Sequence, residues 1–211
     1  MVEPISVSAV GSPRLFEGWR IAGLVGVVAQ DGRLTQMGFE AMNRPDLFGV
    51  EADAFCRRAN HPAPAPGCGC GFYSLREPES ALARPFLDAA SRRPHDVLLR
   101  VALSGTVVES TRGWRASHQT VRQVFVSPRC HRGSCDVPPS MLLPSAVVTL
   151  DTVGRWMRLL PVCSRHSELV FAPVAHPGLS APPPPPPVPM GALSRLSGVP
   201  VSPLDQRFLK L

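Results

Sequence analysis

Lysine is almost absent from this chain, because Lys210 is the only lysine among 22 basic residues. The net charge of +6 at pH 7 therefore comes from arginine. Arginine binds phosphate and carboxylate groups through two parallel hydrogen bonds, so this composition permits a nucleic-acid or acidic partner. A GC-rich genome produces the same bias without any such partner. Since the arginines are scattered and form no run, charge alone does not establish nucleic-acid binding.

Long hydrophobic runs are also lacking. The most apolar stretches, Ile21–Ala29 and Met141–Leu150, fall far short of the roughly 20 residues that a membrane helix needs. The first residues, Met1-Val2-Glu3-Pro4, lack the basic segment and apolar run of a signal peptide. We therefore expect no membrane association and a cytoplasmic location, where clustered cysteines are more often metal ligands than disulfides.

Signatures of common enzyme classes are missing as well. The sequence contains no phosphate-binding loop, no dinucleotide fingerprint and no serine-nucleophile elbow. Cys163 and His166 offer a thiol and a base, but they are only three residues apart, and such pairs normally meet across a fold. A metal- or thiol-dependent enzyme thus remains an alternative, and a binding function is the better expectation.

What the chain has in excess is proline and glycine, with 25 and 17 residues, which predicts many turns and short elements. Apolar stretches rich in β-branched residues predict several strands, at Trp19–Ala29, Arg33–Met37, Gly71–Leu75, Val97–Glu109 and Thr120–Val126. Helical spacing and capping residues predict helices at Glu77–Ser91, within Val147–Leu160 and from Ser164 onward. The expected fold is mainly β (α+β), with a small antiparallel sheet or partial barrel and one or two short helices.

Composition divides the chain into three parts. Residues 1–15 form a short lead-in, and residues 16–172 carry enough apolar sequence for a single globular domain. Residues 173–211 include an unbroken proline run, Pro182–Pro187, which predicts a flexible, proline-rich tail in the polyproline II conformation.

All six cysteines fall into two tight groups, each completed by a histidine. The first group is Cys56, His61, Cys68 and Cys70, and its loop is so rich in proline and glycine that it needs an external staple. Three thiols and one imidazole are the donor set of a closed, tetrahedral Zn²⁺ site. The group therefore predicts a structural zinc ion.

The second group is Cys130, Cys135, Cys163 and His166, with two pairs of donors separated by a longer segment. This layout follows the logic of common structural zinc sites. His131 competes with His166 as the fourth ligand. Because adjacent residues rarely reach one metal with good geometry, His166 is the better candidate beside Cys130.

Other interpretations of the cysteines remain open. They include disulfides, free thiols, an iron–sulfur cluster, and one metal site assembled from both groups. Since each group supplies four donors, a bound ion would have no open coordination position. The expected cofactor is thus one or two structural zinc ions.

Three strings of residues point to relatives: Cys56-x4-His61 with Cys68-Gly69-Cys70-Gly71-Phe72-Tyr73, then Gly113-Trp114-Arg115-Ala116, then Cys163-x2-His166. Over residues 16–166 the chain resembles a group of uncharacterised actinobacterial proteins. The resemblance implies that both cysteine groups belong to one design. It implies no activity, substrate or partner.

Together these patterns favour a non-enzymatic zinc-binding interaction module, with a protein partner as the leading expectation. A nucleic-acid-binding protein is the alternative, since Trp114 with Arg112 and Arg115 resembles a stacking and phosphate-contact patch. The other tryptophan motif, Gly18-Trp19-Arg20, is of the same type. His95 and His118 are expected on the surface.

Overall fold

A computed structural model describes residues 7–8, 15–29, 31–42, 46–78, 93–132, 135–150, 155–167 and 185–205 of the chain. Twelve strands of one sheet, a single α-helix and a short 3-10 helix make up this described part. In chain order they are β1 Val7–Ser8, β2 Phe16–Val28, β3 Leu34–Ala41, β4 Leu47–Phe48, β5 Glu51–Asp53, β6 Phe72–Leu75, β7 Asp96–Ser110, β8 Gly113–Val126, β9 Met141–Leu150, β10 Arg155–Val162, η1 Ser164–His166, β11 Val188–Pro189, α2 Met190–Ser197 and β12 Val201–Pro203.

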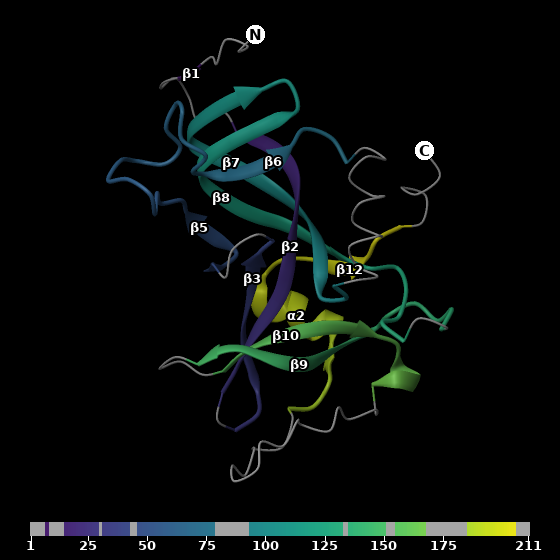
Figure 1. Ribbon diagram of the computed structural model, residues 1–211. Coiled ribbons are helices and arrows are strands. Elements are labelled where there is room, and N and C mark those ends of the chain that lie inside the picture. The colour runs from purple at the N-terminus through teal and green to yellow at the C-terminus, as the bar shows by residue number, and fades with distance from the viewer. Residues whose placement is uncertain are drawn as a thin grey trace.

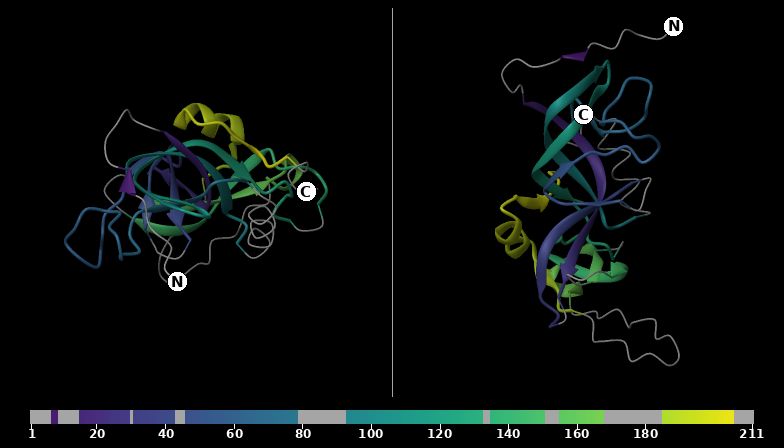
Figure 2. Two further views of the ribbon diagram at one scale, coloured as in Figure 1. Left: turned by 90° about the horizontal axis from the view of Figure 1, so that it is seen from above. Right: turned by 90° about the vertical axis from the view of Figure 1, so that its left-hand side faces the viewer.

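Strand β2 runs the length of the molecule and joins its two halves (Figures 1 and 2). Its first half pairs antiparallel with β7, and its second half pairs with β3 and β10. From Ala22 to Val28 the strand is buried throughout. Burial on both faces explains why this stretch is a continuous apolar run instead of an alternating pattern.

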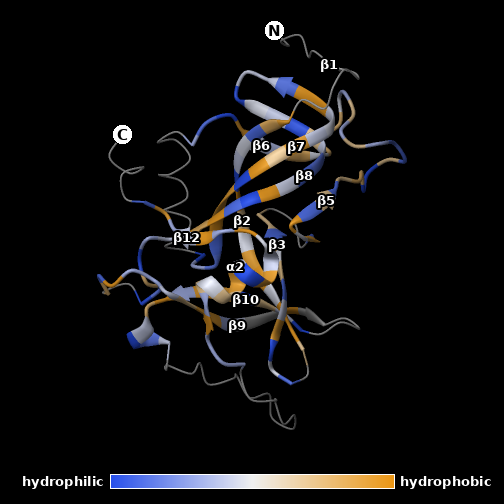
Figure 3. Ribbon diagram, turned by 180° about the vertical axis from the view of Figure 1, so that it is seen from behind, coloured by the Kyte–Doolittle hydropathy of each residue, from blue (hydrophilic) through white to orange (hydrophobic). Residues whose placement is uncertain are grey.

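One half of the molecule is a partial ring of four strands. β7 pairs with β8, β8 with β6, and β2 with both β7 and β6, the last through the single pair Trp19 and Leu75. Hydrophobic and hydrophilic stretches are interspersed along β8 (Figure 3), and its buried residues include Ala116, Val121 and Val124. The predicted fold class, mainly β with an antiparallel sheet and a partial ring, is confirmed.

The close approach of strand β6 to its neighbours depends on two glycines. A Cβ at Gly18 of β2 would overlap with the Ser74 side chain, and a Cβ at Gly113 of β8 would overlap with the Ser74 backbone. The two Gly-Trp-Arg motifs therefore lie on either side of β6. Each places a tryptophan and an arginine next to that strand.

The other half contains β9 and β10, which pair antiparallel and extend the sheet from β2. The helix expected within Val147–Leu160 is wrong for the described residues of that range, which belong to β9 up to Leu150 and to β10 from Arg155. The β-branched run Val147-Val148-Thr149 favours strand, and pairing across the hairpin satisfies its backbone. Asp151 and Thr152, which the sequence offers as caps for such a helix, lie outside the described residues.

Residues 185–205 belong to the globular core, although the sequence analysis ended the domain at residue 172. Met190 and Leu193 of α2 are buried in the main hydrophobic cluster together with Val199 and Val201. Gly198 ends the helix in the left-handed conformation, and β12 then pairs parallel with β8. Residues 188–203 thus pack on one side of the sheet, as the yellow segment in Figure 2 shows.

Two further expectations concern helices. The predicted helix over Glu77–Ser91 lies outside the described residues except for its first two positions. No helix in the described part of the chain is long and apolar enough to span a bilayer.

Candidate metal centres

The first cysteine group converges in the loop that joins β5 to β6. One donor atom each from Cys56, His61, Cys68 and Cys70 lies within 4.8 Å of all the others. The sulfurs of Cys56 and Cys68 are 3.7 Å apart. A tetrahedral ion with bonds of about 2.3 Å to sulfur separates its sulfur ligands by about 3.8 Å. The spacing therefore suits one bound metal ion.

The imidazole of this group is oriented by the backbone. His61 Nδ1 lies 2.9 Å from the carbonyl oxygen of Pro62, which can only accept a hydrogen bond. Nδ1 thus carries the proton, and Nε2 keeps its lone pair. Metal-ligating histidines typically show this arrangement, with the second nitrogen donating to a carbonyl or carboxylate.

Strand β8 holds the loop of the first group in place. The Arg115 guanidinium donates to the carbonyl oxygens of Cys68 and Ala65 and stacks over the Tyr73 ring. Gly71 has a φ of 106°, and a Cβ there would lie 2.8 Å from Arg115 Cγ. A loop with little hydrophobic core is therefore positioned by a cation, a glycine and its four donors.

The thiols of the first group share protons unevenly. Burial opposes ionisation of Cys56, but backbone N–H groups of Arg58 and Ala59 and the Cys68 thiol outweigh it and lower its pKa to about 7. Hydrogen bonds with Cys70 and Cys56, followed by burial, raise the pKa of Cys68. Because thiolates are the metal-ligating form of cysteine, a divalent cation would bind first where the pKa is lowered, at Cys56, and would displace the proton of Cys68 on binding.

The second group brings together the loop after β8 and the end of β10. Its four donors, from Cys130, Cys135, Cys163 and His166, also lie within 4.8 Å of one another. The sulfurs of Cys135 and Cys163 are 3.6 Å apart, and His166 Nδ1 lies 3.4 Å from both Cys130 Sγ and Cys163 Sγ. This group also suits one metal ion.

Helix η1 explains how Cys163 and His166 face one point. The N–H of His166 donates to the Cys163 carbonyl, which closes one turn and places both side chains on the same side. The backbone N–H of Cys163 also donates to Cys130 Sγ. The backbone N–H of His131 donates to the Pro161 carbonyl, and the imidazole that lies with the three thiols is that of His166.

The second group is anchored more deeply than the first. Cys163 is fully buried and Cys130 is 2% exposed, both packed with Leu143, Leu160 and Val162. Burial opposes ionisation of Cys163, but the N–H of His166 and the thiols of Cys135 and Cys130 outweigh it and lower its pKa. Apolar packing therefore supports this site, whereas the first depends on its loop.

The geometry bears on two alternatives for the six cysteines, namely disulfides and a single site built from both groups. All six are free thiols, and sulfur separations of 3.6 to 3.7 Å are far longer than the roughly 2.05 Å of a disulfide. The groups also close separately, so a single site built from both is not formed.

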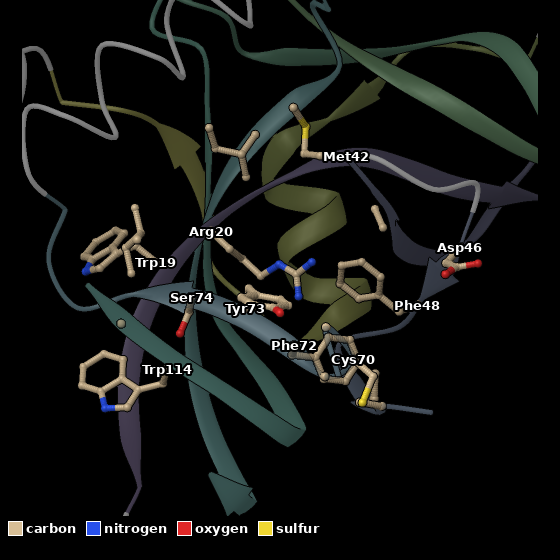
Figure 4. Close-up of a pocket in the computed structure, with 18 of the residues that line it drawn as sticks. Trp19, Arg20, Met42, Asp46, Phe48, Cys70, Phe72, Tyr73, Ser74 and Trp114 are labelled. Carbon is tan, nitrogen blue, oxygen red and sulfur yellow. The ribbon is translucent and has the colours of Figure 1, made fainter. Parts of the chain in front are cut away.

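A cleft of about 730 Å³ adjoins the first metal centre, and the sequence analysis did not predict it. Residues of β2, β4, β5, β6 and β8 line it, and Cys70 and Gly71 form part of its wall (Figure 4). Phe55, Tyr73 and Leu75 all line it and are 64%, 54% and 37% exposed. No local signal predicted this cleft, because its walls come from segments far apart in the sequence.

The predicted stacking patch is organised differently from the expectation. Trp114 packs against Phe16, and the guanidinium of Arg76 lies 4.8 Å from its ring centroid. Arg115 points to the first metal centre instead, through the carbonyl of Cys68. Trp114 nevertheless lines the cleft, together with Arg112.

Apart from the metal centres and the cleft, a cluster of polar side chains lies where β2, β3, β7 and β10 meet. Glu40 accepts two hydrogen bonds of 3.1 Å from Arg158, while His95 and Asp96 lie beside it with Arg93 3.4 Å from the Asp96 carboxylate. His95 was expected on the surface, but it is only 7% exposed, because the strands pack around it. His118 is partly exposed and pairs with Asp53 at 2.8 Å.

Comparison with protein-family models, with curated proteins and with solved structures finds no match to this chain. The resemblance to actinobacterial proteins therefore stays a prediction. The two centres and the cleft are the features of the fold that bear on its function.

Proposed function

We propose that the chain is a zinc-stabilised, non-enzymatic protein-interaction module, which holds one Zn²⁺ in each cysteine group and docks a partner peptide in the cleft beside the first. The convergence of two complete Cys₃His donor sets supports the zinc assignment. Soft thiolates with one imidazole, four per site, are typical of structural zinc. With four protein donors, each ion has no open position for a substrate or a reactive water.

A structural role fits the position of each centre. The first would order the loop 54–71, which forms one wall of the cleft. The second would tie the loop after β8 to the end of β10. Free thiols in both groups suit a reducing compartment, which supports a cytoplasmic location.

Exposed apolar side chains support a protein partner. Phe55, Tyr73 and Leu75 gather around one concave surface, and such patches mark sites of protein or ligand binding. Aromatic side chains supply much of the binding energy at protein interfaces when a partner covers them. We therefore place the docking site in this cleft.

The arginines argue for a peptide over a nucleic acid. A phosphate-binding surface needs a continuous face of unpaired cations. At least six arginines of the described residues instead pair with a carboxylate, on elements spread over the molecule: Arg33–Asp31, Arg57–Asp46, Arg76–Glu109, Arg93–Asp96, Arg100–Glu17 and Arg158–Glu40. These six arginines therefore do not contribute to a face of unpaired cations.

Selection of a displayed random peptide library on the zinc-loaded protein tests the docking function. Enriched peptides should lose binding to the Phe55→Ser and Tyr73→Ser variants and keep it with Leu196→Ser, an exposed leucine on α2 outside the cleft. Binding should depend only weakly on salt. Retention of peptide binding by both cleft variants would contradict the proposal. So would peptide binding that falls steeply with salt and is displaced by an oligothymidylate competitor.

A further inference from the structure

Arg20 places a cation inside the cleft. Its side chain leaves β2 and lies against aromatic rings, with the guanidinium carbon 5.0 Å from the Phe48 centroid and 5.5 Å from that of Phe72 (Figure 4). Nη1 donates a hydrogen bond of 2.8 Å to Gln119 Oε1. Gln119 is fully buried, so it holds the guanidinium in one orientation.

The charge of Arg20 is not compensated within the described part of the chain. No carboxylate there pairs with it, and Nε is buried without a hydrogen-bond partner. Burial lowers the pKa of Arg20 to about 10, and no neighbouring charge contributes to that shift. Arg76, which stacks on Trp114, and the partly buried Arg158 differ, since each of them faces a glutamate.

A cation in this environment favours an incoming anion. Removing a charge from water is costly unless an opposite charge or hydrogen bonds compensate for it. The guanidinium is already held against aromatic faces before a ligand binds. Binding therefore costs it little further conformational entropy. A carboxylate matches its planar fork and gains charge-assisted hydrogen bonds.

The walls of the cleft indicate what surrounds that carboxylate. Trp19 and Trp114 lie on one side of Arg20, and Phe48 and Phe72 lie on the other (Figure 4). A ligand with an acidic group between apolar groups fits this order. Asp46 and Asp53 also line the cleft and disfavour a polyanion such as a nucleic-acid strand.

Resting on the proposed docking function, we infer that the cleft selects a peptide segment in which one Asp or Glu lies between apolar side chains and pairs with Arg20. The apolar neighbours contact the aromatic walls, and the carboxylate supplies specificity. A single buried charge pair of this kind discriminates strongly, because the wrong ligand leaves Arg20 covered and unpaired.

Two pools of fluorescent peptides test the inference. Both are acetylated and amidated, both carry Leu, Phe or Trp on either side of the central residue, and they differ only in Glu or Gln at the centre. Fluorescence polarisation with the zinc-loaded protein should show the Glu pool binding about tenfold tighter or more. Arg20→Met should abolish that preference, and Arg20→Lys should retain part of it. Arg100→Gln, at an exposed arginine outside the cleft, should leave it unchanged.

Each outcome has a defined meaning. Equal binding of both pools, lost in Phe55→Ser and Tyr73→Ser, overturns the carboxylate inference and leaves the docking function standing. Binding of neither pool, or of oligothymidylate alone, overturns both. If Arg20→Met does not fold, the comparison of the Glu and Gln pools on the unmodified protein still decides the question.

Discussion

Arg115 of β8 donates a hydrogen bond to the backbone carbonyl of Cys68, which links the ring of strands to the first metal centre. The same guanidinium reaches the carbonyl of Ala65 at 3.3 Å. The loop that carries three thiols and a histidine is thus fixed at two points by a side chain from a rigid strand. We expect the affinity of this centre for its ion to depend on that contact.

Replacing Arg115 by Gln tests this dependence. The variant loses the contacts that orient the loop, so zinc affinity at the first centre should fall about tenfold or more. The measurement is competition with a chromophoric chelator. Arg100→Gln is the control, since Arg100 pairs with Glu17 away from the loop and should leave both sites unchanged. Equal zinc retention by the two variants would refute the role of Arg115.

Two glycines of the same loop provide a matched pair. Gly71 and Gly67 both have positive φ, but a Cβ at Gly71 would meet Arg115 and Pro64, whereas nothing lies within 4 Å at Gly67. Gly67→Ala should cost about 1 kcal/mol of unfolding free energy and Gly71→Ala about 2–4 kcal/mol. Urea unfolding at constant free zinc measures both. A Gly71→Ala cost no larger than that of Gly67→Ala would contradict the close packing against Arg115.

A histidine pair tests the ligand set of the second centre. His166→Gln should lose the zinc of that centre, and His131→Gln should keep it, because His166 Nδ1 lies 3.4 Å from two sulfurs and His166 completes the donor set. Metal content by mass spectrometry under native conditions distinguishes the two. Loss of zinc in His131→Gln with retention in His166→Gln would show that His131 is the ligand and would contradict the assignment to His166.

Loss of a thiol should unfold each centre locally. Cys68→Ser and Cys163→Ser should each retain one zinc ion and lose amide protection around the altered site only, since the groups close separately. Hydrogen exchange reports this directly. Cys163→Ser should cost more stability than Cys68→Ser, because Cys163 is fully buried in a hydrophobic cluster. Simultaneous loss of both ions from either variant would contradict the independence of the centres.

The sequence predicted the metal centres because their donors are close along the chain. Cys68-Gly69-Cys70 and Cys163-x2-His166 bring half of each donor set together within four residues. The first loop is so rich in proline and glycine that apolar packing alone would not order it. Local spacing therefore carried most of the information about these sites.

Features built from distant segments were not predictable in the same way. The Arg20 environment combines Phe48, Phe72 and Gln119 from three other elements, and only the Gly-Trp-Arg motif marks it in the sequence. Helix α2 was not predicted, because it follows a proline run in the sequence. It is stabilised by burial of Met190 and Leu193 in a core that other parts of the chain form.

The polar cluster around Asp96 gives a stability that depends on pH. Burial raises the pKa of Asp96 from 3.8 to about 6, so its ionised form destabilises the fold. Asp96→Asn should therefore gain stability relative to the unmodified protein as pH rises from about 4 to 6, by up to roughly 1.4 kcal/mol per pH unit, and then level off. Denaturant unfolding across this range measures the difference between the two proteins, in which any shared loss of zinc cancels.

His95, which lies beside Asp96, also makes the free energy of unfolding depend on pH. Burial and the charges of Arg158 and Arg93 lower the pKa of His95 to about 4, so its contribution is present above pH 6.5 and is lost as pH falls toward 4. The contribution of His95 opposes that of Asp96 between about pH 4 and 6.

Asp31→Asn is the control for the direction of the pH effect. The N–H of Arg33 lowers the pKa of that exposed carboxyl, so the stability difference for Asp31→Asn should change with pH in the opposite direction. A constant difference for Asp96→Asn would contradict the assigned ionisation.

Counting zinc in the intact, reduced chain tests the central claim most directly. Native mass spectrometry, supported by elemental analysis, should find two Zn²⁺ ions per chain, and a strong chelator should remove both with loss of structure around loop 54–71 and at the end of β10. A chain that folds fully with no bound metal, or whose mass shows cysteines joined as disulfides under reducing conditions, would contradict the account.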